Sequence, residues 1–165
     1  MNNKQLVRGA LLVALALVLQ GIRVVLPLPP MASTLLIGTL VHMMLAITLW
    51  QSGIAPAFLL AFLLPVTAYL QGQLLLPLLI PVVWVGNMIF VFILGCTAGW
   101  RLFVLPPLLK SVSMCAGAFL VISFLQLTNG AMAKGIMFAM SVPQFATGLL
   151  GLFAAKRLVR LLPKL

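Results

Sequence analysis

The feature that constrains this chain most is an apolar run at residues 8–23, with the sequence RGALLVALALVLQGIR. A basic residue stands at each end, and Gln20 is the only polar side chain between them. At about 1.5 Å rise per residue, a helix of this length nearly spans the ~30 Å hydrocarbon layer of a membrane. In such a helix Ala10 and Ala14 lie on one face, roughly 100–150° away from Gln20 and Arg23. We therefore predict a membrane-spanning helix with one face for another helix and one for a ligand.

The balance of charged residues places the whole chain in the membrane class. Of its 165 residues, 64% are hydrophobic and 6% are charged, whereas about a quarter of the residues in a soluble domain are charged. There are ten Lys and Arg residues and no Asp or Glu. The absence of carboxylates excludes a carboxylate acid–base pair, a carboxylate metal site and the intramembrane acid that proton-coupled carriers use. Because the basic residues flank apolar spans and form no basic face, we expect no nucleic-acid partner.

Hydrophobic length and Gly/Pro punctuation divide the chain into six predicted helices, which form a single transmembrane domain over residues 1–165. Their ranges are about 5–26, 33–50, 54–71, 78–98, 106–127 and 135–155. Pro106 and Pro107 are expected to begin the fifth helix, and Pro143 to lie inside the sixth as a tolerated kink. The expected fold class is all-α, a bundle of six helices integral to the membrane.

Basic residues near the helix ends predict the orientation of this bundle. With six spans both termini lie on one side, and eight of the ten basic residues then fall on that side: Lys4, Arg8, Arg101, Lys110, Lys156, Arg157, Arg160 and Lys164. Arg23 and Lys134 fall on the other side. Cytoplasmic loops are enriched in Lys and Arg. We therefore expect a multi-pass protein of the cytoplasmic (inner) cell membrane, with the N- and C-termini in the cytoplasm.

Polar side chains gather at the other, outer end of the predicted helices. This end holds the residues that we predict to bind a solute: Gln20, Arg23, Trp84, Asn87, Gln126, Asn129, Lys134 and Gln144. The inner halves are almost entirely Leu, Val, Ala, Phe and Met. Amides and charges in hydrocarbon are costly unless they face protein or water, so this asymmetry predicts a polar cavity open to the outside and closed below. A channel would need a polar lining throughout.

Several of these residues also have a simpler interpretation. Asn87 can contact a solute or a backbone carbonyl freed by a proline, and Trp84 can stack on an aromatic solute or belong to the interface belt. Arg23 and Lys134 can hold an anionic group of the substrate or a lipid phosphate. His42 is the single histidine and lacks the neighbours that a metal site needs, so we expect a neutral packing residue.

Taken together, several stretches resemble the substrate-binding S component of energy-coupling factor (ECF) transporters, the vitamin importers of bacteria. They are Ala10-x-x-x-Ala14 in the first helix, the Pro-rich first loop at 26–32 (LPLPPMA), the third-helix stretch at 64–72 (LPVTAYLQG), and Pro81 leading to Gly86-Asn87. The resemblance extends over the whole chain, as six short helices with both ends inside. It implies that Ala10 and Ala14 dock a transmembrane coupling subunit.

The resemblance also implies a function, the capture of a small vitamin-like solute from outside for ATP-driven uptake. The solute would sit near the outer surface under the first loop, where Trp84, Asn87, Gln126 and Gln144 would touch it. The chain has no Gly-rich phosphate loop, so ATP would be used by two partner ATPase subunits. We expect no catalytic residue, no bound cofactor and no metal site in this chain.

Two other classes of function are alternatives to this one. The chain can be a non-transport scaffold or assembly subunit of a membrane complex, with its polar residues serving helix contacts alone. An intramembrane enzyme would need a nucleophile and a base at matching depth. The sequence offers only His42 with Ser33 or Ser141 for these roles, and no nucleophile motif. We therefore expect no enzymatic activity.

Overall fold

The protein is helical throughout the residues 3–26, 28–74, 76–127 and 130–161 that its computed structural model describes, apart from short connections. The helices are α1 (Asn3–Val25), α2 (Pro30–Ser52), α3 (Ile54–Leu70), α4 (Leu79–Cys96), α5 (Arg101–Phe124), α6 (Gly130–Ala139) and α7 (Val142–Leu161). These described residues contain no strand. The predicted all-α class is confirmed.

Among the described residues, five helical stretches are long and apolar enough to cross a membrane. They are α1, α2, α4, α5 and the consecutive pair α6 and α7. Helix α3 is also apolar but has only 17 residues. A helix needs about 20 apolar residues to span the hydrocarbon layer, with a range of about 17–25. These lengths fit a multi-pass membrane protein.

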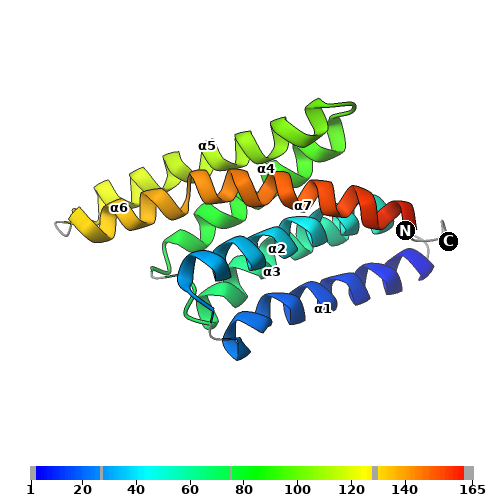
Figure 1. Cartoon of the computed structure of the whole chain (residues 1–165), viewed down its shortest axis with the longest axis horizontal. Coiled ribbons are helices and arrows are strands. Elements are labelled where there is room, and N and C mark those ends of the chain that lie inside the picture. Colours follow the sequence, from blue (N-terminus) through cyan, green and yellow to red (C-terminus); the bar gives the residue numbers. More distant parts are fainter. Residues whose placement is uncertain (1–2, 27, 75, 128–129, 162–165) are drawn as a thin grey trace.

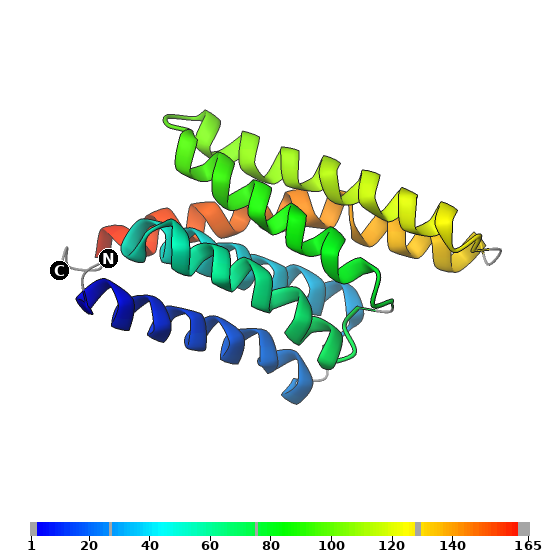
Figure 2. The ribbon, with the colours of Figure 1, turned by 180° about the vertical axis from the view of Figure 1, so that it is seen from behind.

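Helices α1 to α6 run in alternating directions and α7 continues in the direction of α6, so the connections other than α6–α7 collect at two ends of the bundle (Figure 1). One end, which we call the terminal end, holds the start of α1, the end of α7 and the α2–α3 and α4–α5 connections. The α1–α2, α3–α4 and α5–α6 connections lie at the opposite end, which we call the distal end (Figure 2). Helix α2 contacts α1, α3, α4 and α7, so it is the central element of the bundle.

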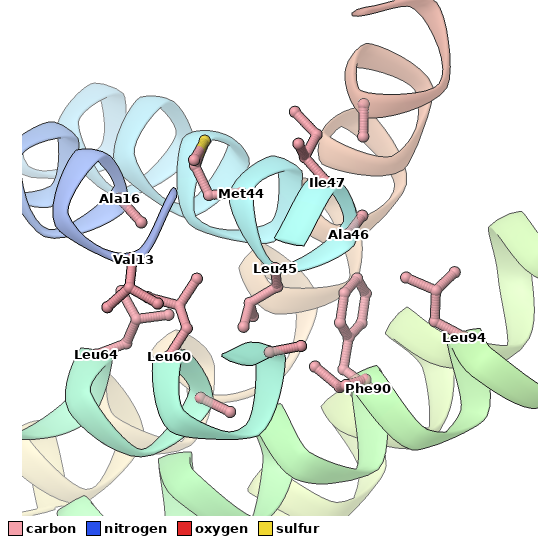
Figure 3. Packing of buried hydrophobic residues seen from close by; sticks show 14 of the residues in the cluster. Val13, Ala16, Met44, Leu45, Ala46, Ile47, Leu60, Leu64, Phe90 and Leu94 are labelled. Atoms are coloured by element: carbon pink, nitrogen blue, oxygen red, sulfur yellow. The ribbon is translucent and has the colours of Figure 1, made fainter. Parts of the chain in front are cut away.

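An apolar core fills the middle and the terminal part of the bundle (Figure 3). Val13 of α1 faces Leu60 and Leu64 of α3, while Leu45 projects from α2 into the same cluster. Phe90 of α4 lies beneath α2 and is fully buried. Dense packing of such side chains holds the helices together, because in a lipid environment close contact replaces the hydrophobic driving force between helices.

Helices α2 and α7 approach closely because small residues lie in their contact. A Cβ atom on Gly151 would lie 2.8 Å from the carbonyl oxygen of Thr39, and one on Gly38 would lie 2.8 Å from Cγ2 of Thr147. Atoms of a larger side chain cannot be placed at such distances, so the glycines set the spacing of the two helices. The contact buries His42 of α2 to 1% exposure.

The fifth helix begins at Arg101, so the prediction that Pro106 and Pro107 start it is wrong. Both prolines are buried inside α5, and Pro107 packs where Gly148 of α7 leaves room. Membrane helices tolerate internal prolines because neighbouring helices and side chains compensate for the lost backbone hydrogen bonds. The earlier start places Lys110 about 13 Å along the helix axis from Arg101, in the interior of the bundle.

The sixth predicted helix, 135–155, is two helices over a longer range, α6 and α7. The expected kink at Pro143 is a break, because α6 ends at Ala139 and Pro143 is the second residue of α7. Proline lacks a backbone N–H and suits the first turn of a helix, where that group has no partner. The carbonyl of Ser141, at the break, accepts a hydrogen bond from Oγ of Ser111 at 2.8 Å. The other four predicted helices agree with the structure to within three residues at each end.

Candidate functional site

A cavity of about 280 Å³ lies between the distal half of the bundle and its middle. Each of the seven described helices contributes at least one lining residue, including Ala139 of α6 and Gln144 of α7. Its lining residues are Gln20, Arg23, Thr34, Ile37, Gly38, Val41, His42, Leu64, Pro65, Ala68, Gln73, Leu74, Val83, Asn87, Lys110, Ala139, Met140 and Gln144. The volume is close to the lower end of the ~300–1,000 Å³ range of small-molecule sites.

The floor of the cavity is a cluster of three buried polar side chains, which we call the Lys110 cluster: His42, Asn87 and Lys110. The Lys110 ammonium lies 2.8 Å from Nε2 of His42 and donates a hydrogen bond of 2.6 Å to Oδ1 of Asn87. The three side chains come from α2, α4 and α5, and each is at most 2% exposed. The cluster therefore joins three helices at mid-depth of the bundle.

Backbone carbonyls fix the direction in which the two neutral members of the cluster point. Nδ1 of His42 lies 2.7 Å from the carbonyl oxygen of Gly38, which can only accept, so this nitrogen carries the proton. Nε2 of His42 consequently presents a lone pair to Lys110. Nδ2 of Asn87 donates to the carbonyl oxygen of Ala61 at 3.4 Å, which turns Oδ1 toward Lys110. Both neighbours thus act as acceptors for one ammonium group.

Lys110 has no side-chain carboxylate to pair with, because the sequence contains no Asp or Glu. The ring of Phe90 lies 5.8 Å from its nitrogen and also packs edge-on against His42. A cation over an aromatic face gains about 0.5–2 kcal/mol, whereas the effective penalty for removing a charge from water is several kcal/mol. The groups of the cluster therefore solvate the ammonium only in part, and Lys110 also borders the cavity.

The walls and the mouth of the cavity carry amides and a second cation. Gln20 donates to the carbonyl oxygen of Leu64 at 2.9 Å and accepts from Oγ1 of Thr67 at 2.9 Å, so its amide is already used in holding α1 to α3. Arg23, one turn further along α1, also lines the cavity and has no hydrogen-bonding partner among the described residues. Gln144 lines it as well, from the first turn of α7.

The structure brings together four of the residues predicted to bind a solute, namely Gln20, Arg23, Asn87 and Gln144. The other described candidates do not line the cavity. Trp84 is 37% exposed and packs edge-on against Phe62, and Gln126 and Lys134 are exposed near the α5–α6 connection. Asn129 lies outside the described residues.

Two residues that complete the floor, His42 and Lys110, are not among the residues that the sequence predicts to bind a solute. His42 was expected to be a neutral packing residue; it is buried and packs against Phe90, and it also lines the cavity and contacts Lys110. Lys110 was placed at the terminal end through the wrong start of the fifth helix. The signal that could have found it is the apolar stretch on both sides of it at 102–125, which is long enough for a lysine inside a span.

The two alanines of the first helix lie on the outside of the bundle. Ala10 and Ala14 are exposed, whereas Gly9, Val13 and Ala16 on the opposite side of α1 are buried against the rest of the chain. The small residues of Ala10-x-x-x-Ala14 therefore do not serve packing within the described part of the chain. They form, with neighbouring leucines, a face of α1 that no described part of the chain covers.

Comparison of the chain with protein-family models, with curated proteins and with solved structures found no match. The geometry of the cavity and of the α1 face is thus the basis on which a function can be proposed. Among the described residues no group of three His, Cys, Asp or Glu side chains could hold a metal ion. What the cavity offers a ligand is positive charge, amide groups and apolar walls.

Proposed function

We propose that the protein is the membrane-embedded substrate-binding subunit of an ECF-type importer, which captures a small vitamin-like solute from outside the cell. The observation that carries this proposal is the cavity whose floor is the Lys110 cluster. A buried cation without a carboxylate partner is costly in a protein that has only a structural role. A bound ligand that accepts a hydrogen bond from Lys110 would complete the solvation of the ammonium group and account for the cluster.

The shape of the cavity favours a receptor over a channel. Its lining extends from the distal end to the Lys110 cluster, and beyond that cluster the bundle is filled by the apolar core around Leu45 and Phe90. A channel needs a polar or wetted path through the whole membrane. A blind cavity suits tight binding from one side, with release requiring a movement of the whole subunit.

The uncovered face of α1 supports the proposal that a partner subunit drives this movement. Ala10 and Ala14 present no bulky side chain to the surroundings, so another helix can approach α1 closely there. In the proposed complex this helix belongs to a transmembrane coupling subunit, and two ATPase subunits supply the energy. The coupling subunit would tilt the receptor within the membrane and carry the cavity to the cytoplasmic side.

Basic residues support an orientation with the distal end outside. At the terminal end lie Lys4, Arg8, Arg101, Lys156, Arg157 and Arg160, and the correction to α5 removes Lys110 from this group. Arg23 and Lys134 are nearer the distal end. The excess of Lys and Arg marks the cytoplasmic side, so both termini are proposed to be cytoplasmic in the cell membrane and the cavity to open outward.

Mass spectrometry of small molecules retained by the purified full-length protein tests the receptor function. We expect one small solute in about equal molar amount to the protein, released on denaturation. The competing function is that of a scaffold subunit of a membrane complex. In that case the purified protein retains no solute, and substitution of Asn87 disturbs assembly of the complex without affecting uptake. The receptor proposal would be falsified if the purified protein retains no solute and the Asn87 substitution disturbs assembly without changing uptake.

The docking part of the proposal has its own test. The double variant Ala10→Leu with Ala14→Leu should lose copurification with the coupling subunit from the membranes of its own cell, yet still bind solute. A matched control is Ala32→Leu with Ala55→Leu, which changes two exposed alanines on α2 and α3. Equal copurification of both double variants would contradict docking through the α1 face.

A further inference from the structure

We propose that the solute is a small monocarboxylate with an apolar body, and that its carboxylate binds at the floor of the cavity to Lys110 and Asn87. This inference rests on the proposed receptor function and names the chemical class of its substrate. It follows from three observations: the hydrogen-bond donors left over at the floor, the balance of charge around the cavity, and the character of the walls.

The floor has two hydrogen-bond donors to spare. A lysine ammonium has three N–H groups, and Lys110 directs two of them to His42 and Asn87. The amide of Asn87 has two N–H groups, of which one is used by the carbonyl of Ala61. Both residues line the cavity. The remaining N–H of each thus offers a pair of donors on neighbouring side chains, which is what the two oxygens of a carboxylate accept.

The charge around the cavity calls for an anion. Lys110 and Arg23 are the cationic residues among the lining residues, and the sequence has no acidic side chain to balance them. His42 cannot supply the missing negative charge, because an imidazole side chain is either neutral or cationic. A ligand carboxylate would give Lys110 its counter-ion in the low dielectric of the interior, where such a pair is strongest.

The size and the walls of the cavity favour a carboxylate over a phosphate. A phosphate group at neutral pH carries up to two charges on three oxygens, whereas the floor supplies a single cation and two spare donors. Above the floor the walls are formed largely by apolar side chains, including Ile37, Val41 and Val83. A volume of about 280 Å³ admits a solute with a short aliphatic chain or one aromatic ring.

The test measures binding of benzoate, phenylacetate and hexanoate, each against its primary amide, to the full-length protein in detergent. An amide has nearly the same shape as its carboxylate but no charge. We expect at least one carboxylate to bind at least about tenfold more tightly than its amide, since a hydrogen bond to a charged group exceeds a neutral one by roughly this factor. Competition between the bound carboxylate and the small-molecule extract of the purified protein then links the probe to the natural solute.

Two variants separate binding from folding. Lys110→Met should weaken carboxylate binding about 30- to 100-fold. Asn87→Asp is isosteric and places a carboxylate 2.6 Å from the Lys110 ammonium. It should raise the thermal midpoint of the ligand-free protein while abolishing preference for the carboxylate probe. The control Lys134→Met removes an exposed lysine of α6 outside the lining and should leave binding unchanged.

The outcomes distinguish this inference from the receptor function. Carboxylate and amide binding with equal affinity, or equal carboxylate binding by wild type and both variants, overturns the carboxylate inference. If none of the probes binds, the inference is also overturned, and the receptor function then depends on whether a solute is retained. A retained solute without an acidic group would leave the receptor function standing and remove only its assignment to monocarboxylates.

Discussion

The two halves of α2 lie in different environments and have different roles. Toward the distal end its residues Ile37, Gly38 and His42 line the cavity, and toward the terminal end Leu45 and its neighbours are fully buried in the apolar core. The helix stays regular across the change from one environment to the other. Packing around Leu45 stabilises the terminal half of α2, whereas the distal half borders the cavity and the Lys110 cluster.

A matched pair of Leu→Ala substitutions puts this contrast to its strongest test. Leu45 is fully buried in the core, whereas Leu74 is partly buried at the cavity. We expect Leu45→Ala to lower the free energy of unfolding by about 2–5 kcal/mol, because it leaves a void in a packed interior. Leu74→Ala should cost much less, because its side chain already borders empty space. Unfolding of both variants in the same detergent by chemical denaturant provides the comparison, and equal losses would contradict it.

Substitution of His42 should affect binding more than stability. His42→Leu removes the acceptor that holds one N–H of Lys110, so the ammonium is no longer fixed toward the cavity. We expect solute binding to weaken about tenfold, the value of one charge-assisted hydrogen bond of about 1.5 kcal/mol. Isothermal titration with the retained solute measures this change. His42→Gln, which keeps a side-chain acceptor, should bind more tightly than His42→Leu, and the reverse order would argue against the cluster.

Arg23 should contribute less than the floor residues because it is nearer the mouth and more exposed. For Arg23→Gln we expect a loss of affinity of about threefold, together with a weaker dependence of the association rate on salt, as for a charge that steers an anion. Stopped-flow binding at two ionic strengths gives both quantities. A loss as large as that of Lys110→Met would mean that the anion binds at the mouth of the cavity.

Trp84 should have the smallest effect. It lies outside the lining and packs against Phe62 on the outer surface of the bundle, which fits the interface position among its two interpretations. Trp84→Phe should therefore change the dissociation constant by less than about twofold, within the ±0.5 kcal/mol of a neutral surface substitution. A tenfold loss in a binding titration would show that the solute reaches this residue.

Much of the architecture follows from hydrophobic length and proline position alone. The helices at residues 5–26, 33–50, 54–71 and 78–98 could be predicted because each is bounded by prolines or glycines outside a long apolar run. The fifth and sixth could not, because a proline can start, interrupt or simply sit inside a membrane helix. Which of these occurs depends on the neighbouring helix, here on the room that Gly148 leaves for Pro107.

The candidate site was predictable in its location but not in its centre. Gln20, Arg23, Asn87 and Gln144 could be placed at one end of the bundle by counting along each helix. The meeting of His42 and Lys110 could not, because it depends on the register of α2 against α5 through α7. The sequence around each residue does not predict the contact, because each is an isolated polar residue in an apolar stretch. The two residues are also 68 positions apart, which matches no short sequence motif.

The orientation of the lone pairs around Lys110 has a consequence for selectivity. His42 and Asn87 are each tied to a backbone carbonyl, so their dipoles keep pointing at the same nitrogen whether or not a solute is present. The floor therefore keeps the same arrangement of hydrogen-bond donors, and the sequence has no acidic side chain to offset the charge of Lys110 and Arg23. Amines and quaternary ammonium compounds of suitable size would be repelled, which makes the cavity a filter for the sign of the solute's charge as well as for its shape.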